Sequence, residues 1–515
     1  MKKIKFFAAA LGLLTFAACS NSDDVFTGSE DLAQEALQDN AITFGTYMGS
    51  AAQTKAGTPG AIAAPDGLKS VAAGFGVFAY YTGNDTYETK NGKANTLYPN
   101  FMYNEQVTWN GSTSAWEYSP LKYWPNDFAN SAVDGQSPAA TGSDTYGGNV
   151  SFFAYAPWVT AGSGEDGIIA ITNNNTLGDP KITYVVAQDQ NNLVDLLWGT
   201  YNSTSPNVLG SGNAGVAANY NSTVTAPIAD RNTQGWQQDI LWIAADSYRM
   251  NADLNKQKTQ GKVGFAFKHA LAKVGGADAS ANATTSGFMI VADFDGTAGA
   301  ITGGTQDANC KITVKEINIV ARSIYNDGGT DKYMKNAKGD LNLATGKWEI
   351  YTTSNLTDDV TSAASKTAAS KTTYSIQNSE LNTNIKDGGE VAFGSQPTGV
   401  TTTPQNIYAA AEAKPLVFIP GTKPELEVTI EYYVTYDADG VSGINRIPQK
   451  IKKTIAFTNP VELNKQYSLL MHLGFTSVKF DATVSTWDEV GTVSGSTPTG
   501  LVDGATIHLP INVKD

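Results

Sequence analysis

Apolar and polar residues alternate over many short stretches of this 515-residue chain, which is the pattern of β-strands with one buried face. In the first such stretch, Ile42-Thr43-Phe44, the two large apolar side chains fall on the same face. Gly, Pro, Asn and Ser crowd the gaps, and these residues favour turns. The pattern predicts strands at 42–44, 74–81, 105–109, 150–156, 182–187, 193–198, 263–267, 288–294, 311–321, 347–352, 416–419, 426–436, 450–457, 467–473 and 476–484.

The strictest alternation lies at the C-terminus, in residues 506–514, after a linker rich in Gly, Ser and Thr. Pro510 has no N–H to donate, which suits an edge strand. Burying four aliphatic side chains contributes at most about 6–12 kcal/mol, so this segment should pair with another strand. Two partners are open: a neighbouring molecule, which would make the segment a donor strand, or the chain's own second domain. The four residues of its apolar face are Ile507, Leu509, Ile511 and Val513.

Composition favours an all-β protein. Charged residues make up only 16% of the chain and there are 50 glycines, whereas long helices are typically rich in residues of high helix propensity such as Ala, Leu, Glu and Lys. The 23 Tyr, 20 Phe and 9 Trp supply enough aromatic area for substantial β cores. A chain of this length predicts two or more domains rather than one.

The N-terminus has the form of an export signal. Lys2, Lys3 and Lys5 precede an apolar run that ends in Ala17-Ala18-Cys19, and this run is too short to span a membrane. Small residues before a cysteine predict cleavage by a lipoprotein signal peptidase and a lipid on Cys19. The alternative is an ordinary signal cut near Ala18, with Cys19 incidental.

No reactive centre is evident in the sequence, and neither a cofactor nor a metal is expected. The three histidines, His269, His472 and His508, lie far apart, and no HExxH motif, phosphate-binding loop or GxSxG motif is present. His269 is interpreted as a structural residue rather than a metal ligand. The net charge of −14 argues against a nucleic-acid partner.

An aromatic group between residues 109 and 124 allows two interpretations. Stacked aromatic side chains bind sugars, but aromatic residues on paired strands also pack into cores, and the core interpretation is favoured. The group consists of Trp109, Trp116, Tyr118, Tyr123 and Trp124.

The order of several motifs resembles the fimbrillin-like (Mfa-like) lipoproteins of Bacteroidetes, the subunits of type V pili. The resemblance rests on residues 101–104, 107–109, 116–125 and 151–157, on Phe265 to Val274, and on Tyr467, Gly474, Phe480 and Trp487. It implies two tandem transthyretin-like β-sandwich domains with an extended C-terminal strand. It also implies a non-enzymatic fimbrial subunit at the surface of the outer membrane, held there by lipid on Cys19 and joined to other fimbrial subunits.

In such families a trypsin-like protease removes an N-terminal strand, and a strand from a neighbour fills the vacated groove. The cut usually follows an Arg, but no Arg precedes the first domain core here, and Lys55 is the closest match in position. The alternative function is a monomeric surface adhesin that binds a glycan or a host protein. The expected layout is a signal peptide (1–18), an acidic tether (19–40), an N-terminal sandwich (41–258), a C-terminal sandwich (259–490), and a linker with the donor-strand candidate (491–515).

Overall fold

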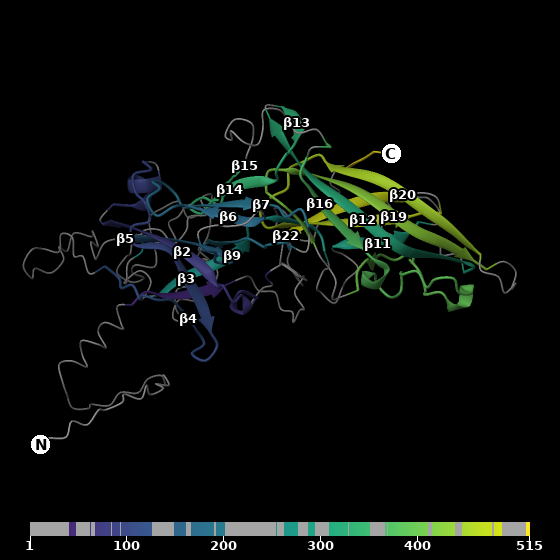
Figure 1. Cartoon of the computed structure of the whole chain (residues 1–515), viewed down its shortest axis with the longest axis horizontal. Helices are drawn as coiled ribbons and strands as arrows, with labels where there is room; N and C mark the ends of the chain where they lie inside the picture. Colours follow the sequence, from purple (N-terminus) through teal and green to yellow (C-terminus); the bar gives the residue numbers. More distant parts are fainter. Residues whose placement is uncertain are drawn as a thin grey trace, which may run out of the picture.

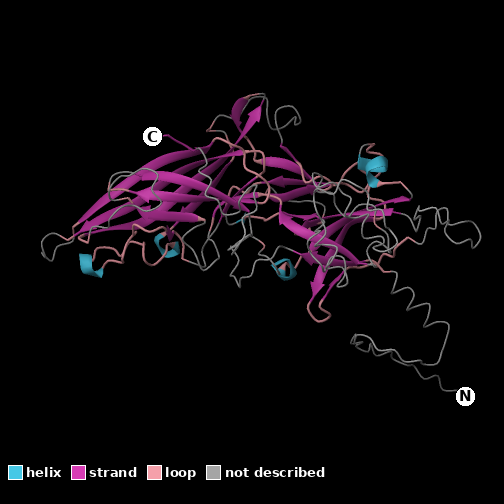
Figure 2. Ribbon diagram, turned by 180° about the vertical axis from the view of Figure 1, so that it is seen from behind, coloured by secondary structure: helices cyan, strands magenta, loops and turns pink. Residues whose placement is uncertain are grey.

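In the part of the chain that the structure describes, the regular secondary structure is almost entirely β-strand, which confirms the expected all-β architecture of two sandwiches followed by a terminal strand. Short single-turn segments such as η1 (Gly67–Ser70) and η2 (Glu88–Gly92) lie outside the sheets (Figure 2). This computed structural model describes residues 41–47, 62, 67–83, 85–92, 94–125, 149–160, 166–189, 192–200, 254, 262–276, 287–293, 308–327, 329–350, 366–367, 369–409, 415–437, 445–475, 478–486 and 511–514.

The first sandwich consists of a seven-stranded sheet and a four-stranded sheet. The larger sheet has the order β1-β9-β8-β5-β2-β3-β4, and the smaller one β15-β14-β7-β6. The larger sheet contains β1 (Thr43–Tyr47), β2 (Phe75–Gly83), β3 (Met102–Asn110), β4 (Ala115–Glu117), β5 (Asn149–Ala156), β8 (Leu197–Thr200) and β9 (Lys262–His269). The smaller sheet contains β6 (Gly167–Ile171), β7 (Lys181–Val185), β14 (Lys338–Asn342) and β15 (Trp348–Ile350).

The seven-stranded sheet curls until its two ends meet. Ala41, just before β1, bridges Tyr123, which follows β4, and the N–H of Ile42 donates to the carbonyl oxygen of Lys122 at 2.9 Å. The concave face therefore encloses a core of its own, which combines Phe and Trp rings with aliphatic side chains. The convex face packs on the four-stranded sheet through a second core that includes Tyr80 and Tyr184.

Burial on both faces explains why β2 reads as a continuous apolar run rather than as a strict alternation. Phe75 and Val77 lie in the core inside the curled sheet, whereas Phe78 and Tyr80 lie in the core beneath the four-stranded sheet. All four side chains are fully buried.

The second sandwich is built around two long strands. β12 is 18 residues long, which corresponds to about 60 Å of extended chain, and it pairs with the 14-residue β19. A bulge between Val314 and Glu316 resets the alternation, so that Ile312, Val314 and Ile317 all face the core. One sheet contains β12 (Cys310–Asp327), β13 (Thr330–Tyr333), β16 (Lys371–Ile376), β19 (Lys423–Tyr436), β20 (Arg446–Phe457) and β23 (Ile511–Lys514). The other contains β10 (Ala272–Gly275), β11 (Phe288–Ala292), β17 (Gln405–Asn406), β18 (Pro415–Phe418), β21 (Lys465–Leu473) and β22 (Val478–Thr486).

The sheets do not divide at residues 258 and 259, where the sequence predicts a domain boundary. β9 begins at Lys262 and yet lies in the first sandwich, between β1 and β8. The polar stretch before it joins two parts of the same sheet, because Leu254 bridges Val150 on β5. The chain passes to the second sandwich only after His269, at Ala270 and Leu271, between β9 and β10.

A hairpin from the second half of the chain returns to the first sandwich. β14 and β15 follow β12 and β13 in sequence, but β14 pairs with β7. Figure 1 shows β6, β7, β14 and β15 between the strands of the curled sheet at one end and β12, β19 and β20 at the other. Two tryptophans fix the hairpin: Trp198 Nε1 donates to the carbonyl oxygen of Leu343 at 3.0 Å, and Trp348 Nε1 donates to that of Ala270 at 2.8 Å.

The alternating C-terminal segment ends in β23, which pairs antiparallel with β20 of the same chain. Its register places Ile511 opposite Phe457 and Lys514 opposite Thr454. β20 ends at Phe457, so continuing this register would place Pro510 opposite Thr458, where the strand has already bent away. Among the described residues, the ladder on β20 therefore comprises four residue pairs.

Replacing Gly346 with Ala tests the docking of the hairpin. Gly346 has a φ of +67°, and a Cβ there would lie 2.1 Å from Cη2 of Trp198. We expect a loss of about 1–3 kcal/mol in the free energy of unfolding from this overlap, beyond the cost of the positive φ. Gly389→Ala is the matched control, because its φ is +83° and no atom lies within 4 Å of the added Cβ. Equal losses in chemical denaturation of the two variants would contradict this packing.

Candidate functional site: the groove filled by β1

β1 lies at one end of the curled sheet and runs parallel to its single neighbouring strand, β9. The pairing extends from Thr43 opposite Lys262 to Tyr47 opposite Ala266. On its other side, the described backbone pairing with the segment after β4 consists of the bridge of Ala41 with Tyr123 and the bond from Ile42 to Lys122. β1 thus fills a groove between two sheet edges that are otherwise separate.

The floor of this groove is aromatic. Phe44 is 3% exposed, and its ring centroid lies 5.3–6.2 Å from four other rings. These distances are typical of favourable aromatic pairs. The four rings belong to Phe75 on β2, Tyr118 after β4, Phe152 on β5 and Phe265 on β9.

The hydroxyl group of Tyr118 holds the start of β1. It donates to the carbonyl oxygen of Ile42 at 2.9 Å and lies 3.2 Å from that of Lys122. Burial raises the pKa of Tyr118 to about 12, so the hydroxyl keeps its proton and remains a donor at neutral pH. This side chain joins β1 to the segment after β4 through a polar contact at the rim of an apolar groove.

A buried ion pair lies where β9 ends. Nδ1 of His269 is 2.9 Å from Oδ2 of Asp195, and their side chains are 2% and 0% exposed. The same Oδ2 accepts a hydrogen bond of 2.7 Å from the N–H of Ile62. Because a carboxylate only accepts, Nδ1 of His269 is the donor in this pair. The pair connects three separate segments, and this agrees with the interpretation of His269 as structural.

A lone carboxylate inside an apolar run is the signal that could have located this pair. Asp195 stands between Leu193-Val194 and Leu196-Leu197-Trp198, where a charge is costly to bury without a partner. The sequence does not indicate which residue supplies that partner.

The sequence-predicted site residues are only partly covered by the structure. Cys19, Lys55, Ile507 and Leu509 lie outside the described residues. Ile511 and Val513 lie on β23, of which the structure describes the backbone pairing. The lipidation, processing and donor-strand roles therefore stay predictions.

Most of the aromatic group between residues 109 and 124 lies in the core. Trp116, Tyr118 and Trp124 are buried inside the curled sheet, and Trp109 packs against this core with its ring 5.4 Å from that of Trp116. Tyr123 differs, since 41% of it is exposed. The favoured core interpretation is confirmed for four of the five residues.

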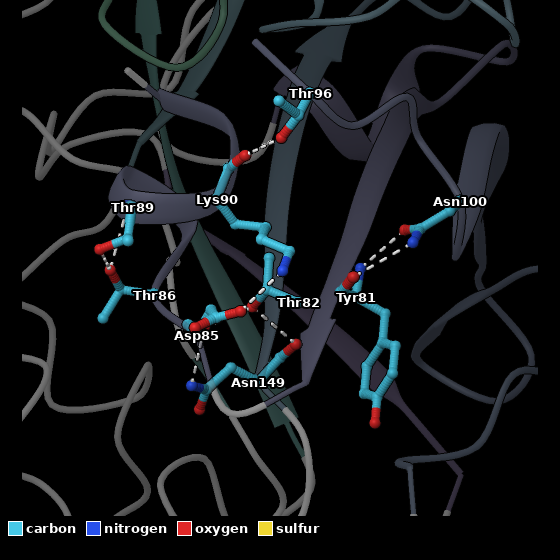
Figure 3. Close-up of polar contacts among 9 residues, drawn as sticks. All are labelled: Tyr81, Thr82, Asp85, Thr86, Thr89, Lys90, Thr96, Asn100 and Asn149. Carbon is cyan, nitrogen blue, oxygen red and sulfur yellow. Dashed lines mark hydrogen bonds and ion pairs between the residues drawn. The ribbon is translucent and has the colours of Figure 1, made fainter. Parts of the chain in front are cut away.

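A second group of polar contacts joins the end of β2 and the start of β5 to the loops that follow β2 (Figure 3). Lys90 Nζ lies 2.8 Å from Oδ2 of Asp85, and Thr82 Oγ1 donates to the carbonyl oxygen of Asp85 at 2.8 Å. The side-chain amide of Asn100 accepts a hydrogen bond from the N–H of Tyr81 at 2.8 Å and donates one to its carbonyl oxygen at 3.1 Å. It thus bonds both backbone groups of Tyr81, as the backbone of a neighbouring strand would. Because most partners are backbone atoms and the side chains are largely exposed, these contacts order the loops.

Within the described ranges, no three His, Cys, Asp or Glu residues are grouped so that they could hold a metal ion. His472 lies on β21, whereas His508 lies outside the described residues. Among the helical segments that the structure describes, none has the length and apolar character needed to cross a membrane.

The fold and the groove define an all-β protein of two sandwiches in which a short first strand fills a hydrophobic groove. No family model matches the sequence. Over 198 residues the chain is 30% identical to the fimbrium subunit Fim1C of Phocaeicola vulgatus, and the match covers 38% of this chain and 42% of that protein. It thus spans less than half of the relative's length. This similarity confirms the resemblance to fimbrillin-like proteins.

The fold is also that of a solved fimbrial protein. The crystal structure of a fimbrial protein from Bacteroides vulgatus superposes with a TM-score of 0.51 at 17% sequence identity. The superposition covers 87% of this chain and 99% of that one.

Replacing Phe44 with Ala tests how much β1 contributes to the first sandwich. Removing a buried Phe typically costs about 3–5 kcal/mol, and we expect a loss of this size in the free energy of unfolding. Thr43→Ala is the matched control on the exposed face of the same strand, with an expected change within about 0.5 kcal/mol. Chemical denaturation followed by tryptophan fluorescence measures both. Similar losses in the two variants would show that the groove does not depend on Phe44.

Proposed function

We propose that this protein is a structural subunit of a cell-surface fimbria that joins its neighbours by exchanging β-strands and has no catalytic role. The relation to a fimbrium subunit and the fold shared with a fimbrial protein support the first part. The observation that carries the exchange of strands is the position of β1, a five-residue strand at the end of a sheet with Ile42 and Phe44 buried in the groove.

The position of Lys55 supports removal of β1 by proteolysis. Lys55 lies between Tyr47, the last residue of β1, and Ile62, whose N–H is held by Asp195. After a cut behind Lys55, the described contacts that hold β1 are non-covalent: its ladder with β9, the contacts at its start and the rings around Phe44. The bond from Ile62 to Asp195 would retain the chain downstream of the cut.

The length of the β23 ladder supports transfer of the tail to a neighbour. The alternating segment runs from Thr506 to Lys514, and β20, which ends at Phe457, offers strand partners in the observed register only from Ile511 onward. The eight residues of β9 offer a longer edge to the segment once β1 has left. Each further backbone hydrogen bond contributes about 0.5–1.5 kcal/mol, so a longer ladder in a neighbour is favoured. In this proposal the pairing with β20 is the resting state before assembly.

Export as a lipoprotein completes the proposal. A lipid on Cys19 would hold the precursor at the outer membrane, and processing after Lys55 would release it for assembly. The proposal applies equally to stalk, tip and anchor subunits. We do not advance the adhesin alternative, because four of the five aromatic residues considered for sugar binding lie in or against the core.

Processing is tested at the N-terminus of the assembled protein. We expect protein from surface polymers to begin at Ala56, and the Lys55→Gln variant to keep its N-terminal segment and to remain monomeric. N-terminal sequencing and mass spectrometry distinguish these forms. Lys347→Gln, an exposed lysine in the turn before β15, is the control and should process normally. Polymers whose subunits still carry an acylated Cys19 would contradict removal of β1.

Strand donation is tested at the tail. Val513→Asp places a charge on the apolar face of the segment, so it should abolish the high-molecular-weight polymers that unboiled surface material shows on a denaturing gel. Deletion of residues 501–515 should have the same effect. Asn512→Asp adds the same charge to the opposite face and should leave the polymers unchanged. Normal polymers from Val513→Asp would exclude the tail as donor strand.

A further inference from the structure

The groove of β1 has two chemically different subsites. Ile42 and Phe44 are 0% and 3% exposed and face inward, whereas Thr43 between them is exposed. The first subsite holds a branched aliphatic side chain and the second a benzyl ring. A strand that replaces β1 in the same register must therefore present an aliphatic residue and, two positions later, a side chain that suits the ring subsite.

The ring subsite is shaped by aromatic geometry rather than by apolar area alone. Phe44 meets Phe75 and Phe152 edge-on, at 84° and 77°, and stacks on Phe265 at 24°. An aliphatic side chain reproduces neither contact and fills less volume, so it would lose the ring–ring attraction and leave a void.

The four rings around Phe44, which we call the cage, also pack against other rings, and this packing limits how far they can move toward a smaller side chain. Phe75 also contacts Trp116, Phe265 and Phe267, with ring centroids 5.0, 5.9 and 5.3 Å away. Close-packed interiors relax only partly around a void, so each ring is held in place by the next. The preference for a ring is therefore built into the fixed part of the sandwich.

The chain's own C-terminal segment does not carry such a side chain. Its apolar face is aliphatic at every position, so no register that keeps this face inward brings a ring to the Phe44 subsite. These positions are Ile507, Leu509, Ile511 and Val513.

We infer that the groove of this subunit is selective for a strand with an aliphatic residue followed two positions later by an aromatic one, so that its assembly partner is a different polypeptide rather than the tail of a second copy. This inference rests on the proposed exchange of strands and specifies the partner in it. It makes the protein a junction between unlike subunits: the groove accepts one kind of strand and the tail supplies another.

Competition between peptides tests this selectivity on the full-length protein. A site-specific protease sequence replaces residues 51–54, and the cut chain exchanges its severed β1 for a fluorescent peptide of residues 40–47. Unlabelled peptides then compete: residues 40–47, the same peptide with Phe44→Leu, and residues 505–515. We expect the natural peptide to bind roughly tenfold more tightly than the other two, from the loss of ring–ring contacts.

A matched pair of variants ties the selectivity to the cage. Phe75 and Phe78 are fully buried phenylalanines on β2, but Phe75 faces Phe44 and Phe78 faces the other core. Phe75→Leu should reduce the preference for Phe over Leu in the peptide, and Phe78→Leu should preserve it. If Phe75→Leu does not fold, Phe152→Leu, which changes another ring of the cage, takes its place in the same comparison.

The outcomes separate this inference from the function on which it rests. If the labelled peptide exchanges and the Phe44→Leu or tail peptide competes equally well, the selectivity is overturned and strand exchange stands. If the labelled peptide does not enter the cut protein at all, strand exchange fails and the selectivity fails with it.

Discussion

The insertion of Phe44 among four aromatic rings is the contact on which the first sandwich depends. It closes a sheet whose ends would otherwise expose two edges and an aromatic cavity to water. Edges of this kind recruit other strands, and proteins normally cover them. Here the cover is a five-residue segment near the N-terminus, joined to the rest of the sandwich by a single strand ladder. The same groove thus closes the fold, and in the proposed function it also receives the strand that replaces β1.

The two sandwiches are joined at two places, the crossover after β9 and the hairpin of β14 and β15. The chain enters the second sandwich after β9 and then sends β14 and β15 back to complete the four-stranded sheet of the first. The bonds from Trp198 and Trp348 tie this hairpin and the crossover together. The ion pair of Asp195 and His269 lies at the same crossover and holds Ile62. A pull on the strand in the groove would thus reach the second sandwich through both the crossover and the hairpin.

Apolar patterning in the sequence predicts most strands but not their partners. The stretches 74–81, 150–156 and 426–436 correspond to β2, β5 and β19. β19 alternates at period two, whereas β2 and β5 are continuous apolar runs rich in aromatic residues, and both patterns favour strands. β14 was missed, since Lys338-Gly339-Asp340-Leu341-Asn342 has a low strand propensity and is held in the sheet by pairing with β7. The boundary expected at residue 258 failed for a related reason. A polar stretch marks a connection, and only the tertiary pairing tells whether that connection lies within a sandwich or between two.

The candidate site was likewise visible only in part. Ile42-Thr43-Phe44 reads as a strand, but nothing local indicates that its neighbour in the sheet lies more than two hundred residues away on β9. Such long-range pairing forms slowly and late in folding, because the chain loses the entropy of closing a long loop before any contact between the two strands stabilises it. A strand that docks last can also leave without disturbing the ladders formed before it. In the proposed exchange, the parallel pairing of β1 at the end of the sheet links its folding order to its use, because the strand that docks last in the groove is also the strand that leaves it.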